Sequence, residues 1–251
     1  MGSSRLPNKV MQRVLEKPLL GWMLDRVALS KLLDDIIVAT TVECRDDVIV
    51  DYTAGAGFKV HRGSEDDVLD RYYEAACKVG ANTIVRLTAD CPLIDSNVID
   101  QVIKEYLNGG YDFVSNTEPL PSSWPDGMDV SVFSFDALKE SWEAARLPSE
   151  REHVTFHFWN NSDRFRCKRI ECEVDLSCYR LTVDYAEDLA VVSNIIEAFG
   201  QVDPEAVKLL SIRELIRYLE KNIEVYNLNK HYYAGIGWKP SFDRDKAAPS
   251  E

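Results

Sequence analysis

The sequence contains no run of about 18 consecutive apolar residues, so we expect no transmembrane helix and no membrane partner. Its first residues are polar and offer no apolar segment of the signal-peptide kind. Cationic residues are in the minority, with 29 Lys and Arg against 42 Asp and Glu and a formal net charge of −13. This balance argues against a nucleic-acid partner, whereas a small anionic substrate stays compatible because local cations decide its binding.

Closely spaced cysteine pairs are also absent. None of the six cysteines forms a CxxC pair: they are Cys44, Cys77, Cys91, Cys167, Cys172 and Cys178. The last three, spaced by five and six residues, raise the alternative of a metal site, but no nearby histidine completes it. We therefore favour free thiols in a reducing compartment and a cytoplasmic location.

The rest of the composition is ordinary for a globular protein, with 45% hydrophobic and 28% charged residues among 251. Helical and strand-like patterns alternate along the first 115 residues, which predicts an α/β fold with a mostly parallel, doubly wound sheet. Proline-rich loops and alternating strands follow. We divide the chain into a nucleotide-binding α/β part (1–118), an inserted antiparallel subdomain (119–180), a return to the α/β part (181–231) and an extended tail (232–251).

The expected elements follow from apolar periodicity and capping residues. In the first part, helices are expected over 18–27, 46–54, 64–80 and 96–107, with strands over 35–41, 58–61, 82–88 and 111–115. Later strands are expected over 128–133, 164–174 and 180–184, and later helices over 186–199 and 211–221. A capping box at Ser149 and Glu152 predicts a further helix, which carries His153.

The N-terminal loop, residues 2–9, is the first candidate site. Gly2, Ser3 and Ser4 form a small flexible turn, and two cations follow it at Arg5 and Lys9. Such a turn can direct backbone N–H groups at an anion, so the loop predicts phosphate binding, although it is not a Walker loop. A frayed terminus or an expression scar is the alternative.

A phosphate loop of this kind normally follows a strand at the centre of an α/β sheet. Nothing precedes Met1 in this sequence, so either the chain lacks its natural first strand or this reading of the loop is wrong. We favour the first alternative, through a truncated sequence or a start codon assigned too late.

Two aspartates stand where predicted strands end, Asp90 after 82–88 and Asp184 at the end of 180–184. Ligands of open α/β sheets bind at the carboxyl ends of strands, and paired carboxylates there can hold Mg²⁺ beside a triphosphate. For Asp90, a cap or turn is the alternative. Helix-start acids such as Asp95, Glu187 and Asp188 are read as structural.

Weaker candidates lie on predicted helices. Arg71 could reach an anion or pair with Asp67 one turn away, and the pair is the favoured reading. Arg151 and His153 have no capping role, so they remain candidates for substrate binding.

Six segments, taken in order, resemble one family, the SpsF-type cytidylyltransferase-like proteins of spore coat polysaccharide biosynthesis. This family is related to the CMP-sugar synthetases that activate acylneuraminates and 3-deoxy-manno-octulosonate. The resemblance runs to about residue 228 and rests on residues 2–9, Arg62–Arg71, Ala89–Ile94, Asp126–Val130, Glu150–Thr155 and Thr182–Asp184.

The resemblance implies a GT-A-like, nucleotide-diphospho-sugar transferase fold and an enzyme that uses Mg²⁺ and CTP. A sugar hydroxyl would attack the α-phosphorus, giving a CMP-sugar and pyrophosphate. It further implies a homodimer with the inserted subdomain at the contact. By motif, the nucleotide-binding set is Gly2, Ser3, Ser4, Arg5, Lys9, Thr40, Thr41 and Arg86; the catalytic set is Arg5, Lys9 and Asp90; the metal ligands are Asp90 and Asp184; and the substrate-binding candidates are Arg71, Asp129, Arg151 and His153.

The chain departs from the family pattern at three points. The Gln-Ala-Arg that usually precedes the loop is missing, and Asn8 and Ala89 stand where glycine is usual. Two alternatives therefore stay open: a glycosyltransferase that consumes a nucleotide sugar, although Asp90-Cys91-Pro92 is not a DxD motif, and an inactive nucleotide-binding subunit.

Overall fold

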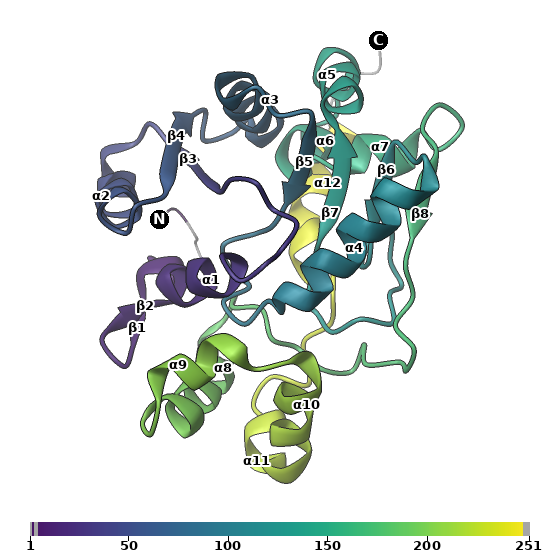
Figure 1. Ribbon diagram of the computed structural model, residues 1–251. Helices are drawn as coiled ribbons and strands as arrows, with labels where there is room; N and C mark the ends of the chain where they lie inside the picture. Colours follow the sequence, from purple (N-terminus) through teal and green to yellow (C-terminus); the bar gives the residue numbers. More distant parts are fainter. Residues whose placement is uncertain (1, 3–4, 248–251) are drawn as a thin grey trace.

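The computed structural model describes Gly2 and residues 5–247, which form a small hairpin and two further sheets with helices around them (Figure 1). The smaller sheet pairs β3 (Ile37–Thr41) with β4 (Lys59–Gly63) in parallel. The larger sheet has the order β5-β7-β6-β8. Its strands are β5 (Thr83–Arg86), β6 (Phe113–Ser115), β7 (Ser131–Ser134) and β8 (Cys167–Arg169). Within the described residues, no strand bridges β3 and β5.

The larger sheet is mixed rather than mostly parallel. Strand β7 runs antiparallel to both β5 and β6, whereas β8 is parallel to β6. The segment 119–180 therefore contributes an antiparallel strand, as expected, but this strand lies between β5 and β6. The domain boundaries at 118, 180 and 231 stay a prediction.

Helices lie on both sides of the larger sheet. Figure 1 shows α4 (Ser96–Gly109) crossing its front, against β6 and β7, while α6 (Pro148–His153) and α12 (Lys239–Ala247) lie behind it. The helices of the first 160 residues are α1 (Leu19–Val27), α2 (Asp47–Gly55), α3 (Val68–Val79), α4 (Ser96–Gly109), α5 (Phe135–Ala144), α6 (Pro148–His153) and α7 (Phe156–Asn160). None of the helices in the described part of the chain is both long and apolar enough to cross a membrane.

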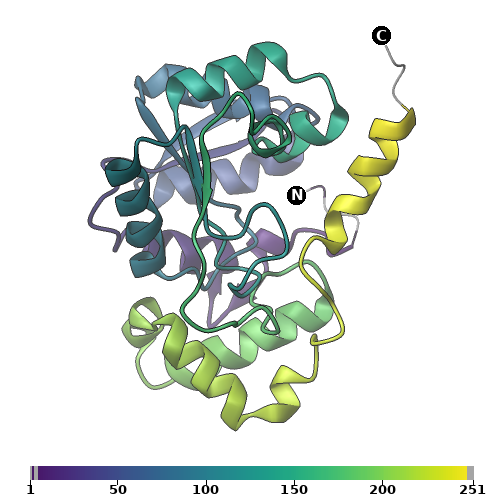
Figure 2. The same cartoon turned by 90° about the vertical axis from the view of Figure 1, so that its right-hand side faces the viewer.

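A separate group of helices lies below the sheets in Figures 1 and 2. It comprises α8 (Ala186–Gly200), α9 (Pro204–Leu209), α10 (Ile212–Lys221) and α11 (Ile223–Tyr226). Shorter elements are the hairpin β1 (Arg13–Val14) and β2 (Lys17–Pro18) and the 3-10 turns η1 (Lys9–Met11), η2 (Cys44–Asp46) and η3 (Ile236–Trp238).

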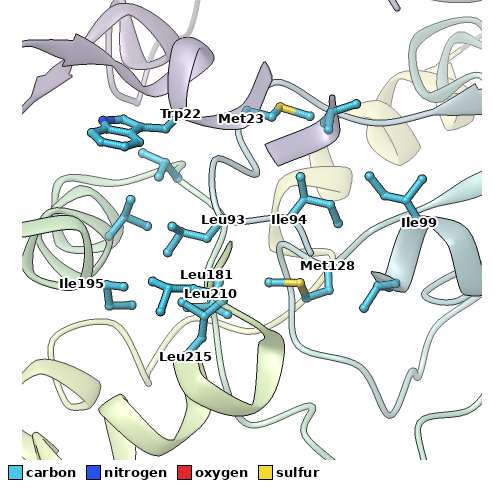
Figure 3. Packing of buried hydrophobic residues seen from close by; sticks show 14 of the residues in the cluster. Trp22, Met23, Leu93, Ile94, Ile99, Met128, Leu181, Ile195, Leu210 and Leu215 are labelled. Atoms are coloured by element: carbon cyan, nitrogen blue, oxygen red, sulfur yellow. The ribbon is translucent and has the colours of Figure 1, made fainter. Parts of the chain in front are cut away.

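The main core joins these parts and fixes the loops between them. Figure 3 shows side chains from α1, α4, α8 and α10 converging on Leu93, Met128 and Leu181, which are fully buried loop residues. Burying such a side chain contributes roughly 1.5–3 kcal/mol. The segments that carry Asp90, Asp129 and Asp184 are thus anchored by apolar neighbours one to three residues away in the sequence.

Arg26 is a polar tie within this core. Its buried guanidinium donates to the carbonyl of Ile94 at 2.8 Å, to that of Leu210 at 2.6 Å and to that of Val207. Burial lowers the pKa of Arg26 to about 10. One side chain therefore holds α1, the loop before α4 and the end of α9 together.

Several expected elements differ in the structure. Residues 181–183 form no strand; only Arg180 bridges to Asp126, because this segment is buried by helices instead of strand neighbours. The strand expected over 164–174 is confined to β8. Helix α6 begins at Pro148, after Leu147 as N-cap, so the capping box at Ser149 is wrong. The tail is not extended either, because residues 239–247 form α12.

Candidate functional site

Lys9 lies between the two predicted metal ligands. Its Nζ donates to Asp90 Oδ2 at 2.8 Å and to Asp184 Oδ1 at 2.9 Å. Arg5 Nη2 also donates to Asp184 Oδ1, at 2.9 Å. The cations of the N-terminal loop therefore face the carboxylates of Asp90 and Asp184 directly, which is the juxtaposition that the sequence predicted.

Backbone hydrogen bonds bring the two aspartates together. Asp90 follows β5 in a turn, and its carbonyl accepts from the backbone N–H of Val183 at 2.8 Å. The backbone N–H of Leu181 donates to the Asp126 carbonyl at 2.7 Å. The chain entering Asp184 is thus aligned between the Asp90 turn and the Asp126 turn, although it forms no strand.

Gly127 allows this close approach. Its φ is +102°, and a Cβ added there would lie 2.5 Å from backbone atoms of Leu181 and Thr182. Only glycine tolerates both the backbone conformation and the contact. Next to it, Asp129 Oδ2 accepts from the Gly127 N–H at 2.7 Å, which keeps this carboxylate at the site.

Arg180 is a buried cation that the sequence-based set missed. Its Nη2 donates to Asp184 Oδ2 at 3.1 Å, its Nε donates to Asp188 Oδ1 at 2.9 Å, and its Nη1 binds Asp126. Asp188 also accepts from the backbone N–H groups of Asp184 and Tyr185. The structural role predicted for Asp188 is confirmed, and Asp188 also holds Arg180 in place. The signal was available: Arg180, Asp184 and Asp188 are spaced by four.

The charges at the site perturb one another. Burial alone would lower the pKa of Lys9, but Asp90 and Asp184 raise it well above its usual value. Burial would raise the pKa of Asp90, yet Lys9 and neighbouring hydrogen bonds lower it to about 2. Burial and the nearby Asp129 carboxylate raise the pKa of Asp126 to about 8. Lys9 is therefore charged and Asp90 ionised at neutral pH.

The two aspartates fit a hard divalent cation. Both carboxylates already converge on one ammonium nitrogen, so their oxygens share a single cation position. Mg²⁺ typically takes one or two protein carboxylates and completes its octahedron with water and phosphate oxygens. Within the described ranges, no cluster of three His, Cys, Asp or Glu residues forms a closed cage, and this chemistry requires none.

Of the remaining nucleotide-binding candidates, Gly2, Thr40 and Thr41 contact other groups. Gly2 is exposed beside the Arg45–Glu65 ion pair, and Ser3 and Ser4 lie outside the described residues. Thr40 and Thr41, at the end of β3, both donate their hydroxyls to Asp46 Oδ2, at 2.8 and 2.7 Å. Their assignment to the base stays a prediction.

Arg86 ends β5 and borders the carboxylates from another side. Burial raises the pKa values of Glu118 and Asp129, and the positive charge of Arg86 partly lowers them again. Arg86 Nε and Glu118 Oε2 are buried and have no hydrogen-bond partner among the described residues. A donor and an acceptor are thus unused beside Asp129.

The weaker candidates are engaged elsewhere. Arg71 does not form the expected ion pair with Asp67 and instead donates to the Ser64 carbonyl at 2.6 Å. Arg151 takes Asp67 as its partner and ties α6 to the N-cap of α3. The His153 ring lies under the C-terminal segment, with Nε2 2.9 Å from Ser241 Oγ. Their roles in substrate binding stay predictions.

The C-terminal segment after Asn229 also reaches the site. Tyr232 stacks on Tyr185, and a Cβ added to Gly237 would lie 3.1 Å from Arg5 Nη1. Further on, α12 (Lys239–Ala247) packs against α6, where Ser241 contacts His153 and Phe242 stacks on Phe156. Figure 2 shows this segment rising from the lower helices along the side of the molecule.

The α/β frame that carries this cationic loop and the two carboxylates has the nucleotide-diphospho-sugar transferase fold, which it shares with solved nucleotidyltransferases. Over residues 1–236 the sequence matches the cytidylyltransferase family, and the chain belongs to that family.

Individual relatives agree with this assignment. The chain is 30% identical to the spore coat polysaccharide biosynthesis protein SpsF of Bacillus subtilis, over 88% of this chain and 91% of that protein. It is 34% identical to the 3-deoxy-manno-octulosonate cytidylyltransferase of Geobacter sulfurreducens, over 89% of this chain and 85% of that one. A solved cytidylyltransferase from Leptospira borgpetersenii is similar with a TM-score of 0.83 and 35% identity, over 90% and 92% of the two chains.

Proposed function

We propose that this chain transfers the CMP group of CTP to a hydroxyl of a sugar acid, with Mg²⁺ as cofactor, and releases pyrophosphate. The observation that carries the proposal is the convergence of Lys9 and Arg5 on Asp90 and Asp184. It places anion-binding and cation-binding groups within one hydrogen bond of each other, as a metal-bound triphosphate requires. Membership of the cytidylyltransferase family supports CTP as the nucleotide.

Each group has a distinct part in the reaction. Asp90 and Asp184 would hold Mg²⁺, which when bound neutralises charge on the phosphates as the α-phosphorus is attacked. Arg5 and Lys9 would bind the outer phosphates and stabilise the departing pyrophosphate through charge-assisted hydrogen bonds. Arg180 keeps the Asp184 carboxylate fixed from its far side. The attacking oxygen comes from the sugar, so catalysis consists of positioning and electrostatics.

The sugar would bind beside Asp129, on the side bordered by Arg86 and Glu118. The unpartnered Arg86 Nε and Glu118 Oε2 supply a donor and an acceptor for a polar ligand. A sugar acid is the substrate class that the name of the Geobacter relative indicates, and the name of the Bacillus relative indicates surface polysaccharide synthesis. We further propose a cytoplasmic location, since all six cysteines are free. A homodimer is proposed on the family resemblance alone.

Pyrophosphate release tests this function. CTP, Mg²⁺ and a panel of 2-keto-3-deoxy sugar acids should give pyrophosphate with at least one acceptor, and UTP or ATP should give much less. Asp90→Asn should lower kcat/KM by about 10²-fold or more. Asp34→Asn, a change at an exposed aspartate, is the matched control and should keep wild-type rates. Full activity of the Asp90 variant would contradict the metal role.

A further inference from the structure

Tyr232 comes from a segment that the proposed mechanism does not use. It follows α11 and precedes η3, and its ring stacks on that of Tyr185 with 4.1 Å between centroids and 6° between planes. Tyr185 is the residue directly after Asp184. A half-buried side chain near the C-terminal end is thereby held beside a predicted metal ligand.

The stacked pair belongs to a closed circuit of five residues. The Arg5 guanidinium lies over the Tyr185 ring at 5.2 Å, and the Arg180 guanidinium lies over the Tyr232 ring at 5.7 Å. The same two arginines donate to the two oxygens of Asp184, at 2.9 and 3.1 Å. Each arginine is thus fixed by a ring and by the carboxylate together.

We propose that Tyr232 is a positioning residue for this reaction, which sets Asp184 and Arg5 through Tyr185 and Arg180. This inference rests on the proposed cytidylyl transfer, because it assigns Tyr232 a part in that same site. Arginine has many rotamers, and the face of a tyrosine ring restricts a guanidinium to one plane. Without the stack, Arg5 loses that restriction, and the metal ligand loses one of its fixed neighbours.

The ring, not the hydroxyl, carries this role. Tyr232 Oη makes one exposed hydrogen bond of 3.3 Å, to Glu187. Phenylalanine keeps the stack and the cation contact, whereas leucine keeps the volume of a large apolar residue but loses the flat face. The neighbouring Tyr233, 65% exposed, provides a matched control for a lost tyrosine.

Kinetics of three variants test the proposal. Tyr232→Leu should lower kcat by about tenfold and weaken Mn²⁺ binding in the presence of CTP. A displacement of reacting groups by about an ångström lowers reaction rates by a comparable or larger factor. Tyr232→Phe should restore both to within about twofold of wild type, and Tyr233→Leu should change neither. Wild-type kcat and Mn²⁺ affinity in Tyr232→Leu would overturn the inference.

A double-mutant cycle with Tyr185→Leu separates coupling from general damage. If the two rings act through one stack, the double variant should be no slower than the slower single variant, whereas multiplied losses would overturn the proposal. Should Tyr232→Leu not fold, Tyr185→Leu against Tyr185→Phe removes the same stack from the other ring.

The same cycle measured by urea unfolding needs no substrate. Absence of pyrophosphate release and of CTP binding in the wild type would refute the proposed function. If Tyr185→Leu and Tyr232→Leu change the free energy of unfolding additively, the two rings do not interact, and the stack is refuted whatever reaction the wild type catalyses.

Discussion

The ammonium group of Lys9 lies 2.8 Å from the Asp90 carboxylate, where it occupies the position that a divalent cation would need. The same nitrogen lies 2.9 Å from Asp184. Under the proposed function, Lys9 and the metal would compete for the two carboxylates until a triphosphate offers Lys9 other oxygens. This relationship would couple metal binding to nucleotide binding.

Replacing Lys9 with methionine tests that coupling. Without nucleotide, Lys9→Met should bind Mn²⁺ about tenfold more tightly than the wild type, because the two carboxylates lose their internal counter-ion. Its affinity for CTP should fall by a comparable factor, since a phosphate ligand is lost. Electron paramagnetic resonance titration of free Mn²⁺ measures the first effect. Equal Mn²⁺ affinity in both proteins would contradict the competition, and Lys104→Met, at an exposed lysine, is the control.

The Asp90–Lys9 pair also makes stability depend on pH. The pKa of Asp90 is lowered to about 2 in the folded protein, against about 3.9 for a free aspartate. Its stabilising effect is therefore present above pH 4 and is lost as the pH falls from about 4 to about 2. We expect this contribution to be about 1–2 kcal/mol, because the side chain is 25% exposed and partly screened.

Urea unfolding of the wild type and Asp90→Asn across that range measures this contribution. The gap in unfolding free energy between the two proteins should narrow as the pH approaches 2. If the difference in unfolding free energy between the two proteins stays constant from pH 6 to pH 2, the Asp90–Lys9 pair does not make stability depend on pH in this range.

Arg26 offers a test of the scaffold that is separate from catalysis. Arg26→Ala leaves three buried carbonyls, those of Ile94, Val207 and Leu210, without their donor. Hydrogen bonds to charged groups contribute about 1.5–3 kcal/mol each, and the losses overlap, so we expect about 3–5 kcal/mol of destabilisation. Chemical denaturation should show this loss, while Lys104→Ala should stay within about 0.5 kcal/mol of wild type. A loss below 1 kcal/mol would contradict the role of Arg26 as a tie.

Acidification should loosen α12 from α6. Burial lowers the pKa of His153 to about 4, so the docked ring is neutral, whereas an exposed ring would be protonated below about pH 6.5. The docked state therefore loses stability as the pH falls through 6.5 toward 4, by about 2 kcal/mol between pH 7 and pH 5. The protection factors for hydrogen exchange over 239–247, taken relative to the intrinsic exchange rate at each pH, should fall accordingly. In His153→Gln, these protection factors should become insensitive to this pH change, and unchanged pH sensitivity there would exclude His153 as the cause.

The sequence predicted the facing pairs of the site because they follow general rules. Asp90 follows β5, and ligands of open α/β sheets bind at the carboxyl ends of strands, which accounts for the meeting of Lys9 with Asp90. Asp184 reaches the same place on a segment that forms no strand. The parallel pairing of β3 with β4 and the positions of α1 to α4 follow equally from local periodicity.

The missed residues differ in how visible they were. The spacing of Arg180, Asp184 and Asp188 was a local signal that was overlooked, whereas the pairing of Arg180 with Asp126 and the stack of Tyr232 on Tyr185 join residues distant in the chain, which local patterns do not reveal. The apolar alternation over 180–184 indicated a strand, yet burial without a neighbouring strand gives the same pattern. Likewise, the polar composition of 239–247 hid α12, whose few buried groups, such as Ser241, dock on α6.

A crystal structure with CTP and Mn²⁺, read by anomalous diffraction, tests the central arrangement most directly. The account predicts one manganese peak between the carboxylates of Asp90 and Asp184, with Lys9 moved onto phosphate oxygens and Arg5 in contact with the triphosphate. A manganese peak elsewhere in the molecule, with Lys9 still bridging the two aspartates, would contradict it.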